Sequence, residues 1–186
     1  TTPIVCCGMV GARQGWTEAA YLPVPCKGPD ATQCVKAPVS DPRIDVRILP
    51  GVKQDDPADV MRGEETQVFG YLAEDPGFEG LLCLPGTHTK WVEIAGGKIV
   101  TCRTSMTGEL FALLSNSSVL RHSVGGKSLD AGVFAAAILE ASGPTPALPG
   151  SLFSIRAADL LHGQTRDSAT ARLSGLLIGG ELAGMQ

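Results

Sequence analysis

The stretch LPGTHTKW, residues 84–91, joins two apolar segments through a short run of polar residues. The segment before it, GLLCL at 80–84, predicts a buried strand that ends at a Pro-Gly turn, and WVEI at 91–94 predicts the next strand. Backbone N–H groups in a glycine turn, flanked by threonine hydroxyls and a lysine, can hold phosphate oxygens. The stretch is not a P-loop, because G-x-x-x-x-G-K-[ST] is absent and the turn joins strand to strand. A plain β-turn with exposed polar side chains is the alternative interpretation.

The segments around this turn predict a mixed succession of strands and helices. Strands are predicted at 4–7 and 44–49, and a hairpin at 91–103 around Gly96-Gly97. A helix is expected over 59–72, because it starts with acidic residues, and another from Thr107, whose hydroxyl could cap it. Apolar residues at helical spacing predict a further helix over 171–186. The sequence therefore predicts an α/β protein.

Composition narrows the class of protein. The 186 residues include 15 Lys+Arg and 19 Asp+Glu, a formal net charge of −4, and 44% are hydrophobic. Such a chain can bury a core in one domain or in two lobes, and it lacks the basic stripe that nucleic acid binding requires. No apolar run reaches the roughly 18 residues of a membrane span. We expect a cytoplasmic protein with neither a nucleic acid nor a membrane as its partner.

The pattern of the six cysteines favours buried free thiols. They include no C-x-x-C pair, and several stand in apolar segments such as Ile4–Cys7 and Leu81–Leu84. Disulfides and a metal site are the alternatives. The three histidines are scattered and show no spacing typical of metal ligands.

Two further segments carry chemistry-bearing side chains. In MRGEETQ, residues 61–67, Glu64 and Glu65 at a helix start could supply a general base and a metal partner, or could be acids that favour the helix dipole on a solvated surface. In GMVGARQGW, residues 8–16, Arg13, Gln14 and Trp16 could bind a carboxylate, a hydroxyl and a sugar face. The alternative for the second segment is a loop whose tryptophan simply packs.

Taken together, these strings resemble one family. CGMVGxxxGW (7–16), VMRGEETQ (60–67), LPGTHTKWV (84–92), MTGELFALLSN (106–116) and LSGLLIGGE (173–181) are similar, in this order, to 2-dehydro-3-deoxygalactonokinase, also called 2-keto-3-deoxygalactonate kinase. That family belongs to the sugar-kinase/actin/Hsp70 superfamily. The resemblance implies a two-lobed, ribonuclease-H-like α/β fold with ATP and substrate in the cleft between the lobes.

The resemblance also implies an activity and roles for particular residues. The activity is ATP-dependent phosphorylation of the 6-hydroxyl of 2-dehydro-3-deoxy-D-galactonate in galactonate catabolism, with Mg²⁺ bridging the phosphates. Glu64 is the implied catalytic base and Glu65 its substitute. The carboxylate of the substrate favours Arg13 as its ligand, with Gln14 and Trp16 beside it and Arg62 as the second candidate. The implied phosphate-binding residues are Gly86, Thr87, His88, Thr89 and Lys90. The implied partners are ATP and a small sugar acid, and a homo-oligomer is compatible with the sequence.

Two elements of the family do not occur in the sequence: an Asp-x-Gly-Thr/Ser-type first phosphate loop and a glycine-rich adenosine-binding segment. We therefore expect the chain to be the middle of the enzyme, lacking the N-terminal strands and the C-terminal adenosine-binding part. Residues 1–78 would be the later part of the first, substrate-side lobe, and residues 79–186 the first part of the second, nucleotide-side lobe. A kinase for another 2-keto-3-deoxy sugar acid and a non-catalytic fragment of the same fold are the alternatives.

Overall fold

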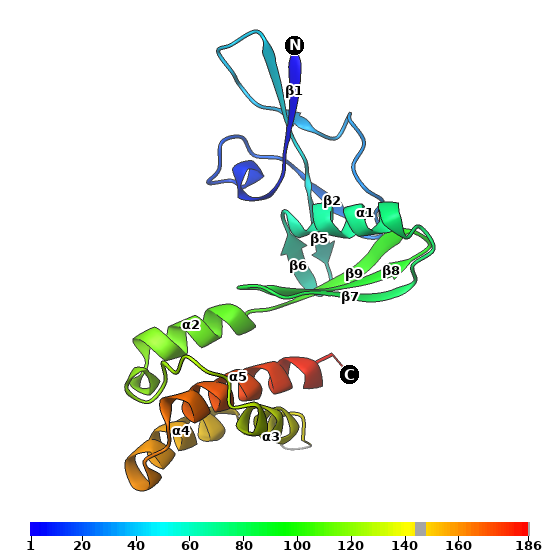
Figure 1. Ribbon diagram of the computed structural model, residues 1–186. Helices are drawn as coiled ribbons and strands as arrows, with labels where there is room; N and C mark the ends of the chain where they lie inside the picture. Colours follow the sequence, from blue (N-terminus) through cyan, green and yellow to red (C-terminus); the bar gives the residue numbers. More distant parts are fainter. Residues whose placement is uncertain (144–147, 186) are drawn as a thin grey trace. The chain divides into compact units, whose positions relative to one another are not determined.

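The predicted hairpin is present in the computed structural model, which describes residues 1–143 and 148–185. Strands β8 (Thr89–Ala95) and β9 (Lys98–Ser105) flank Gly96 and Gly97, whose φ angles of 58° and 67° lie in the left-handed region that glycine adopts without strain. Strand β7 (Gly80–Leu84) pairs antiparallel with β8 and lies at the edge of the sheet β7-β8-β9 (Figure 1). The hairpin at 91–103 and a strand at 80–84 are therefore confirmed. The expected burial of the strand at 80–84 is wrong, because its side chains are mostly exposed at the edge of the sheet.

Two smaller sheets are formed by the first 61 residues. One has the order β1-β4-β3, from Thr2–Cys6, Ile44–Ile48 and Val35–Lys36, and the other the order β2-β5-β6, from Tyr21–Pro23, Gly51–Asp55 and Ala58–Met61. In each sheet an early strand lies parallel to one about 30–40 residues further on. The strands predicted at 4–7 and 44–49 are present, whereas β2, β3 and β5 are not predicted from the sequence.

The helix expected over 59–72 is wrong in its first part. Residues 58–61 form strand β6, and helix α1 spans Glu64–Glu74. The Asp59 carboxylate accepts hydrogen bonds from the backbone N–H and the hydroxyl of Thr104 on β9, so this acid secures a strand rather than a helix start. The change of direction falls at Gly63, whose φ of 115° is accessible to glycine and strained for other residues.

Apolar side chains of α1 and of two sheets form the main core of this part. The core joins β5, β6, α1, β8 and β9 through fully or nearly fully buried residues, among them Val52, Met61, Val68, Val92 and Ile99. A smaller cluster under β4 contains Ala19, Ala37, Val46 and Ile48. The main core contains Val68 and Leu72 of α1, so it fixes the position of this helix, and with it the position of the two glutamates at its start.

The described residues from 107 onward are mostly helical. Helices α2 (Thr107–Ser117), α3 (Ala131–Ala141), α4 (Leu148–His162) and α5 (Arg166–Ala183) surround their own apolar core, with a short 3₁₀ turn at Val119–His122. Another 3₁₀ turn, Gly8–Gly11, lies near the N-terminus. The helix predicted over 171–186 is confirmed as far as Ala183, and Gln186 lies outside the described residues. The predicted cap is wrong, because Met106 is the N-cap of α2 and the Thr107 hydroxyl bonds the Glu181 carboxylate instead.

The chain divides into two compact units. Unit 1 contains residues 1–85 and 89–104, and unit 2 contains residues 86–88 and 105–186. The three-residue turn after β7 thus groups with the helical unit, while the strands on both sides of it belong to unit 1. This division differs from the lobe boundary expected near residue 78, which concerns the complete protein and stays a prediction.

None of the six cysteines, all of which lie in the described residues, forms a disulfide. The expectation of burial is correct for Cys26 and Cys102 and wrong for Cys7 and Cys83, which are exposed. The physical reason is that β1 and β7 are edge strands with mostly exposed side chains, which their apolar sequences do not reveal. Among the described residues, no helix combines the length and the apolar character that crossing a membrane requires.

Candidate active site

Two glutamates open helix α1, and they differ sharply in environment. Glu65 is 1% exposed, and its carboxylate accepts the backbone N–H of Gly63 at 2.6 Å. Burial raises the pKa of Glu65 above its ordinary value. Glu64 is only half-buried, and its carboxylate accepts the backbone N–H of Arg62 at 3.1 Å. Glu64 is therefore the accessible acid, whereas Glu65 caps the helix from within.

A glycine pair brings the first motif to this helix start. A Cβ atom on Gly63 would lie 3.2 Å from the Cα of Gly8, and Gly8 itself has a φ of 82°. Glycine at both positions allows the backbones to approach closely, and both conformations are strained for other residues. Gly8 thus meets the Glu64 end of α1, although it lies 55 positions before Gly63 in the sequence. The sequence indicates both segments as candidates but not this contact.

Arg62 anchors the same junction. Its guanidinium lies over the Tyr21 ring, with Cζ 4.1 Å from the ring centroid, and Nη2 donates to the Ala19 carbonyl oxygen at 2.7 Å. The nitrogen Nη1 is buried and has no hydrogen-bond partner among the described residues. Arg62 is thus mostly committed to holding the segment after the glycine loop, and its Nη1 is buried rather than open to a ligand.

The other predicted substrate ligands lie on the surface of unit 1. Arg13 and Gln14 are exposed, and Trp16 is 50% exposed, in the loop that follows the 3₁₀ turn Gly8–Gly11. The backbone N–H of Trp16 donates to the Val10 carbonyl oxygen at 2.9 Å, which folds the loop back on the turn. The alternative of a simply packed tryptophan does not fit a half-exposed ring. These side chains are accessible for a ligand.

The predicted phosphate turn is fastened to the start of helix α2. Its Thr87 carbonyl oxygen accepts the backbone N–H of Glu109 at 2.9 Å, and His88 Nε2 lies 2.5 Å from Glu109 Oε2. A Cβ atom on Gly108 would stand 2.5 Å from the Gly86 carbonyl oxygen, so only glycine fits there. Gly86, Thr87 and His88 are exposed. Gly108 and Glu109 escaped the site prediction, although both stand in the MTGELF string.

Thr89 and Lys90 differ from the other three residues of the turn. Their exposed fractions are 5% and 6%. The Lys90 ammonium donates to the Val60 carbonyl oxygen and to the Thr104 hydroxyl, each at 2.7 Å. The structure therefore divides the predicted phosphate-binding residues into three that face solvent and two that are buried in unit 1.

The exposed turn carries several groups that can contact an anion. It combines exposed backbone, the Thr87 hydroxyl and the His88 imidazole, which are groups that bind phosphate oxygens. No cluster of three or more His, Cys, Asp or Glu side chains suited to a metal exists in the described part of the chain. Mg²⁺ commonly keeps its waters and binds through substrate phosphates, so this arrangement is compatible with a nucleotide-borne Mg²⁺.

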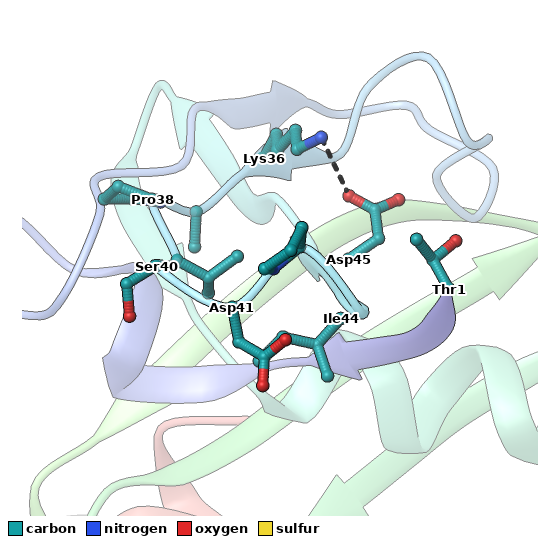
Figure 2. Close-up of a pocket in the computed structure, with 10 residues that line it drawn as sticks. Thr1, Lys36, Pro38, Ser40, Asp41, Ile44 and Asp45 are labelled. Atoms are coloured by element: carbon teal, nitrogen blue, oxygen red, sulfur yellow. Dashed lines mark ion pairs between the residues drawn. The ribbon is translucent and has the colours of Figure 1, made fainter.

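A separate hollow lies at one edge of unit 1. Figure 2 shows Lys36 and Asp45 paired across it at 3.3 Å, with Pro38, Ser40, Asp41 and Ile44 around them. None of the residues predicted to bind substrate or phosphate lines this hollow. The accessible candidate residues instead lie in the loop at 13–16, at the start of α1 and in the turn that precedes β8.

Comparison with known proteins agrees with the resemblance seen in the sequence. The family model for 2-keto-3-deoxy-galactonokinase matches residues 1–186. A protein from Rhizobium meliloti (strain 1021) described as a probable 2-dehydro-3-deoxygalactonokinase, DgoK1, is 45% identical over 98% of this chain. The 2-dehydro-3-deoxygalactonokinase of Escherichia coli (strain K12) is 42% identical over 100% of it. The chain belongs to the 2-keto-3-deoxy-galactonokinase family.

A solved structure supports the same relationship. A crystal structure of a Sinorhizobium meliloti protein assigned as a 2-dehydro-3-deoxygalactonokinase matches 98% of this chain with a TM-score of 0.89 and 44% identity. The chain covers 62% of that structure, and 61% and 62% of the two curated relatives. It therefore spans about three fifths of the length of these relatives, and its mixed α/β fold corresponds to part of theirs.

Proposed function

We propose that the full-length protein transfers the γ-phosphoryl group of ATP to the 6-hydroxyl of 2-dehydro-3-deoxy-D-galactonate, as a step of galactonate catabolism. Membership in the kinase family supports this proposal. The observation that carries it is the contact between Gly8 and Gly63, which joins a loop rich in sugar-binding side chains to a helix start that bears an accessible carboxylate. A sugar-acid kinase needs both groups at one place: a ligand for the acid and a base for the attacking hydroxyl.

We assign the base to Glu64. A general base must reach the proton that it removes, and Glu64 is the half-buried member of the pair. Its carboxylate stands in the first turn of α1. Glu65 is buried and already bonded to the Gly63 N–H, so its role is to hold the geometry of the helix start.

The carboxylate of the sugar acid is assigned to Arg13. Planar guanidinium groups bind carboxylates through two parallel hydrogen bonds, and Arg13 is exposed in the loop that Gly8 brings to α1. Gln14 would bind a hydroxyl, and the half-exposed Trp16 ring would cover a face of the sugar chain. Arg62 is the weaker candidate because its guanidinium already serves Ala19 and Tyr21.

The phosphates of ATP are assigned to the turn Gly86–His88. The nucleotide brings Mg²⁺, which supplies charge neutralisation on the phosphate oxygens when bound. The role of this chain is to hold the turn in one shape, through the Thr87 carbonyl bond and the fit of Gly108 against Gly86. A rigid turn loses little conformational entropy when it binds a phosphate.

A coupled ADP-release assay of the full-length protein against a panel of 2-keto-3-deoxy sugar acids tests the proposal. We expect turnover with the galactonate-derived acid, and Glu64→Gln should lower kcat by about 10²–10⁴-fold with little change in ATP affinity. The matched control is Glu74→Gln, at the exposed far end of α1. Arg13→Ala should raise KM for the acid by about 10–100-fold, the value of one charged hydrogen-bonded contact.

Each other outcome of the assay has a defined meaning. Preference for a different epimer would make the protein a kinase for another 2-keto-3-deoxy sugar acid. Normal kcat in Glu64→Gln together with a loss in Glu65→Gln would move the base to Glu65. The absence of turnover with every acid would reject the kinase assignment.

A further inference from the structure

Lys90 is the buried member of a polar network that the proposed reaction does not use. Its ammonium bonds the Val60 carbonyl oxygen and the Thr104 hydroxyl, each at 2.7 Å. The Thr104 hydroxyl in turn donates to Asp59 Oδ1 at 2.6 Å, and the Thr104 N–H donates to Asp59 Oδ2 at 2.6 Å. We call Lys90, Thr104 and Asp59, together with the Val60 carbonyl, the Lys90 network.

A lysine that is only 6% exposed is costly to bury unless its charge is balanced. Here the Thr104 hydroxyl relays the interaction to the Asp59 carboxylate, so positive and negative charges stand at the two ends of a short chain of hydrogen bonds. Such a network is favourable only when its members keep one geometry. The strands that carry it, β6, β8 and β9, are therefore held in a fixed register.

The strand held in this way leads directly into the candidate active site. Strand β6 is the edge strand of the sheet β2-β5-β6, and it ends at Met61, which is 1% exposed. The Lys90 bond to Val60 and the burial of Met61 fix the backbone just before Gly63. Because Gly63 is conformationally permissive, the start of α1 depends on what holds the residues on its N-terminal side.

We propose that Lys90 is a positioning residue: through the Val60 carbonyl it holds β6, and thereby sets the place of the Glu64 carboxylate. This inference rests on the proposed kinase function. It differs from the role suggested by the sequence, in which Lys90 contacts phosphate. To reach a phosphate, the ammonium would have to leave both of its hydrogen-bond partners, whereas the positioning role uses the contacts that it already makes.

Steady-state kinetics of the full-length protein distinguish the two roles. We expect Lys90→Met to lower kcat by about 10–100-fold, the usual effect of misplacing a catalytic group by about 1 Å, while KM for ATP changes less than about twofold. Thr104→Val, which removes only the hydroxyl between Lys90 and Asp59, should also lower kcat, and Thr104→Ser should restore it. The control is Lys98→Met, an exposed lysine on the same hairpin.

A loss of ATP affinity of about 10-fold or more in Lys90→Met, with normal kinetics in Thr104→Val, would assign Lys90 to the phosphates and overturn the inference. Normal kinetics in both variants would overturn it as well. If Lys90→Met does not fold, Thr104→Val and its serine rescue decide.

Amide hydrogen exchange gives a test that is independent of turnover. In Thr104→Val we expect faster exchange at the backbone amides of residues 62–66, with no change in Lys98→Met. Unchanged exchange there would overturn the inference even if the kinase is active. A wild-type protein that phosphorylates none of the acids, with exchange still increased in Thr104→Val, would refute the proposed function and leave the positioning of the helix start intact.

Discussion

The replacement Gly108→Ala tests whether the turn before β8 is held by helix α2. The added Cβ would stand 2.5 Å from the Gly86 carbonyl oxygen and 2.8 Å from the Thr87 Cα, whereas ordinary contact begins near 3.4 Å. The turn must therefore move by about 3.4 − 2.5 = 0.9 Å, since both neighbours are backbone atoms that cannot rotate away. The backbone bond from Glu109 to Thr87 would be strained by the same movement.

The magnitude follows from two opposing effects. Overpacking against rigid neighbours costs about 1–3 kcal/mol, and alanine gains up to about 1 kcal/mol over glycine in a helix. We expect a net loss of about 1 kcal/mol in the free energy of unfolding. A catalytic or binding group displaced by nearly 1 Å costs about 10²-fold in rate, so kcat/KM for ATP should fall by about that factor.

Urea unfolding and kinase assays of the full-length protein measure both effects. The matched control is Gly180→Ala in α5, where the added Cβ meets nothing within 4 Å and should stabilise the helix by about 1 kcal/mol. If Gly108→Ala were as stable and as active as Gly180→Ala, the turn could not be packed against α2 as described, and its assignment to the phosphates would lose its structural basis.

Three further predictions concern the units themselves. Gly179→Ala should lower the free energy of unfolding by about 1–2 kcal/mol, because the added Cβ would stand 2.6 Å from the Ile138 carbonyl oxygen of α3. The neighbouring variant Gly180→Ala is the control, and a gain of stability in both variants, measured by urea unfolding, would contradict this packing. Ellman's reagent at pH 8 should modify Cys7 rapidly, but Cys26 and Cys102 only after unfolding, because burial raises the pKa of these two thiols to about 11. Fast labelling of Cys26 and Cys102 in the folded protein would refute their burial. Burial also raises the pKa of Glu65, so the folded state keeps the proton on this carboxyl to a higher pH than the unfolded state does. The protonated Glu65 therefore favours the folded state at low pH, and this contribution to the free energy of unfolding is lost as pH rises through the pKa of the folded state. Glu65→Gln should therefore stabilise the protein more at pH 8 than at pH 4, and the opposite order in urea unfolding would show that the carboxylate is favoured in the fold.

Local patterns predicted some elements correctly and failed at others for identifiable reasons. The Gly96-Gly97 hairpin and the β7 strand follow from turn chemistry and apolar runs, which act over a few residues. Local pattern predicts Asp59 as a helix-start acid, but its carboxylate bonds Thr104, which lies 45 residues further on. It predicts Thr107 as a helix cap, but the Thr107 hydroxyl bonds Glu181, 74 residues away. In both cases a distant partner took the group that local propensity had assigned.

The candidate site shows the same division. The sequence named Arg13, Glu64, Glu65 and the turn before β8, because these residue types occur in strings that resemble one kinase family. Their environments could not be predicted in this way. Glu64 and Glu65 are neighbours in the chain, yet one is half-buried and the other is 1% exposed. Lys90 stands in a polar turn sequence, yet it is buried between β6 and β9.

The sequence by itself determined the mixed α/β character, the family, and which segments carry the chemistry, because these depend on residue type, order and short-range pattern. Only the tertiary structure decided that Gly8 meets Gly63, that Gly108 receives the turn at Gly86, and that Lys90 bonds the Val60 carbonyl. The physical reason is that burial and hydrogen-bond partnership depend on groups far apart in the chain. A residue type defines what a side chain can do, and the fold determines which partner it meets.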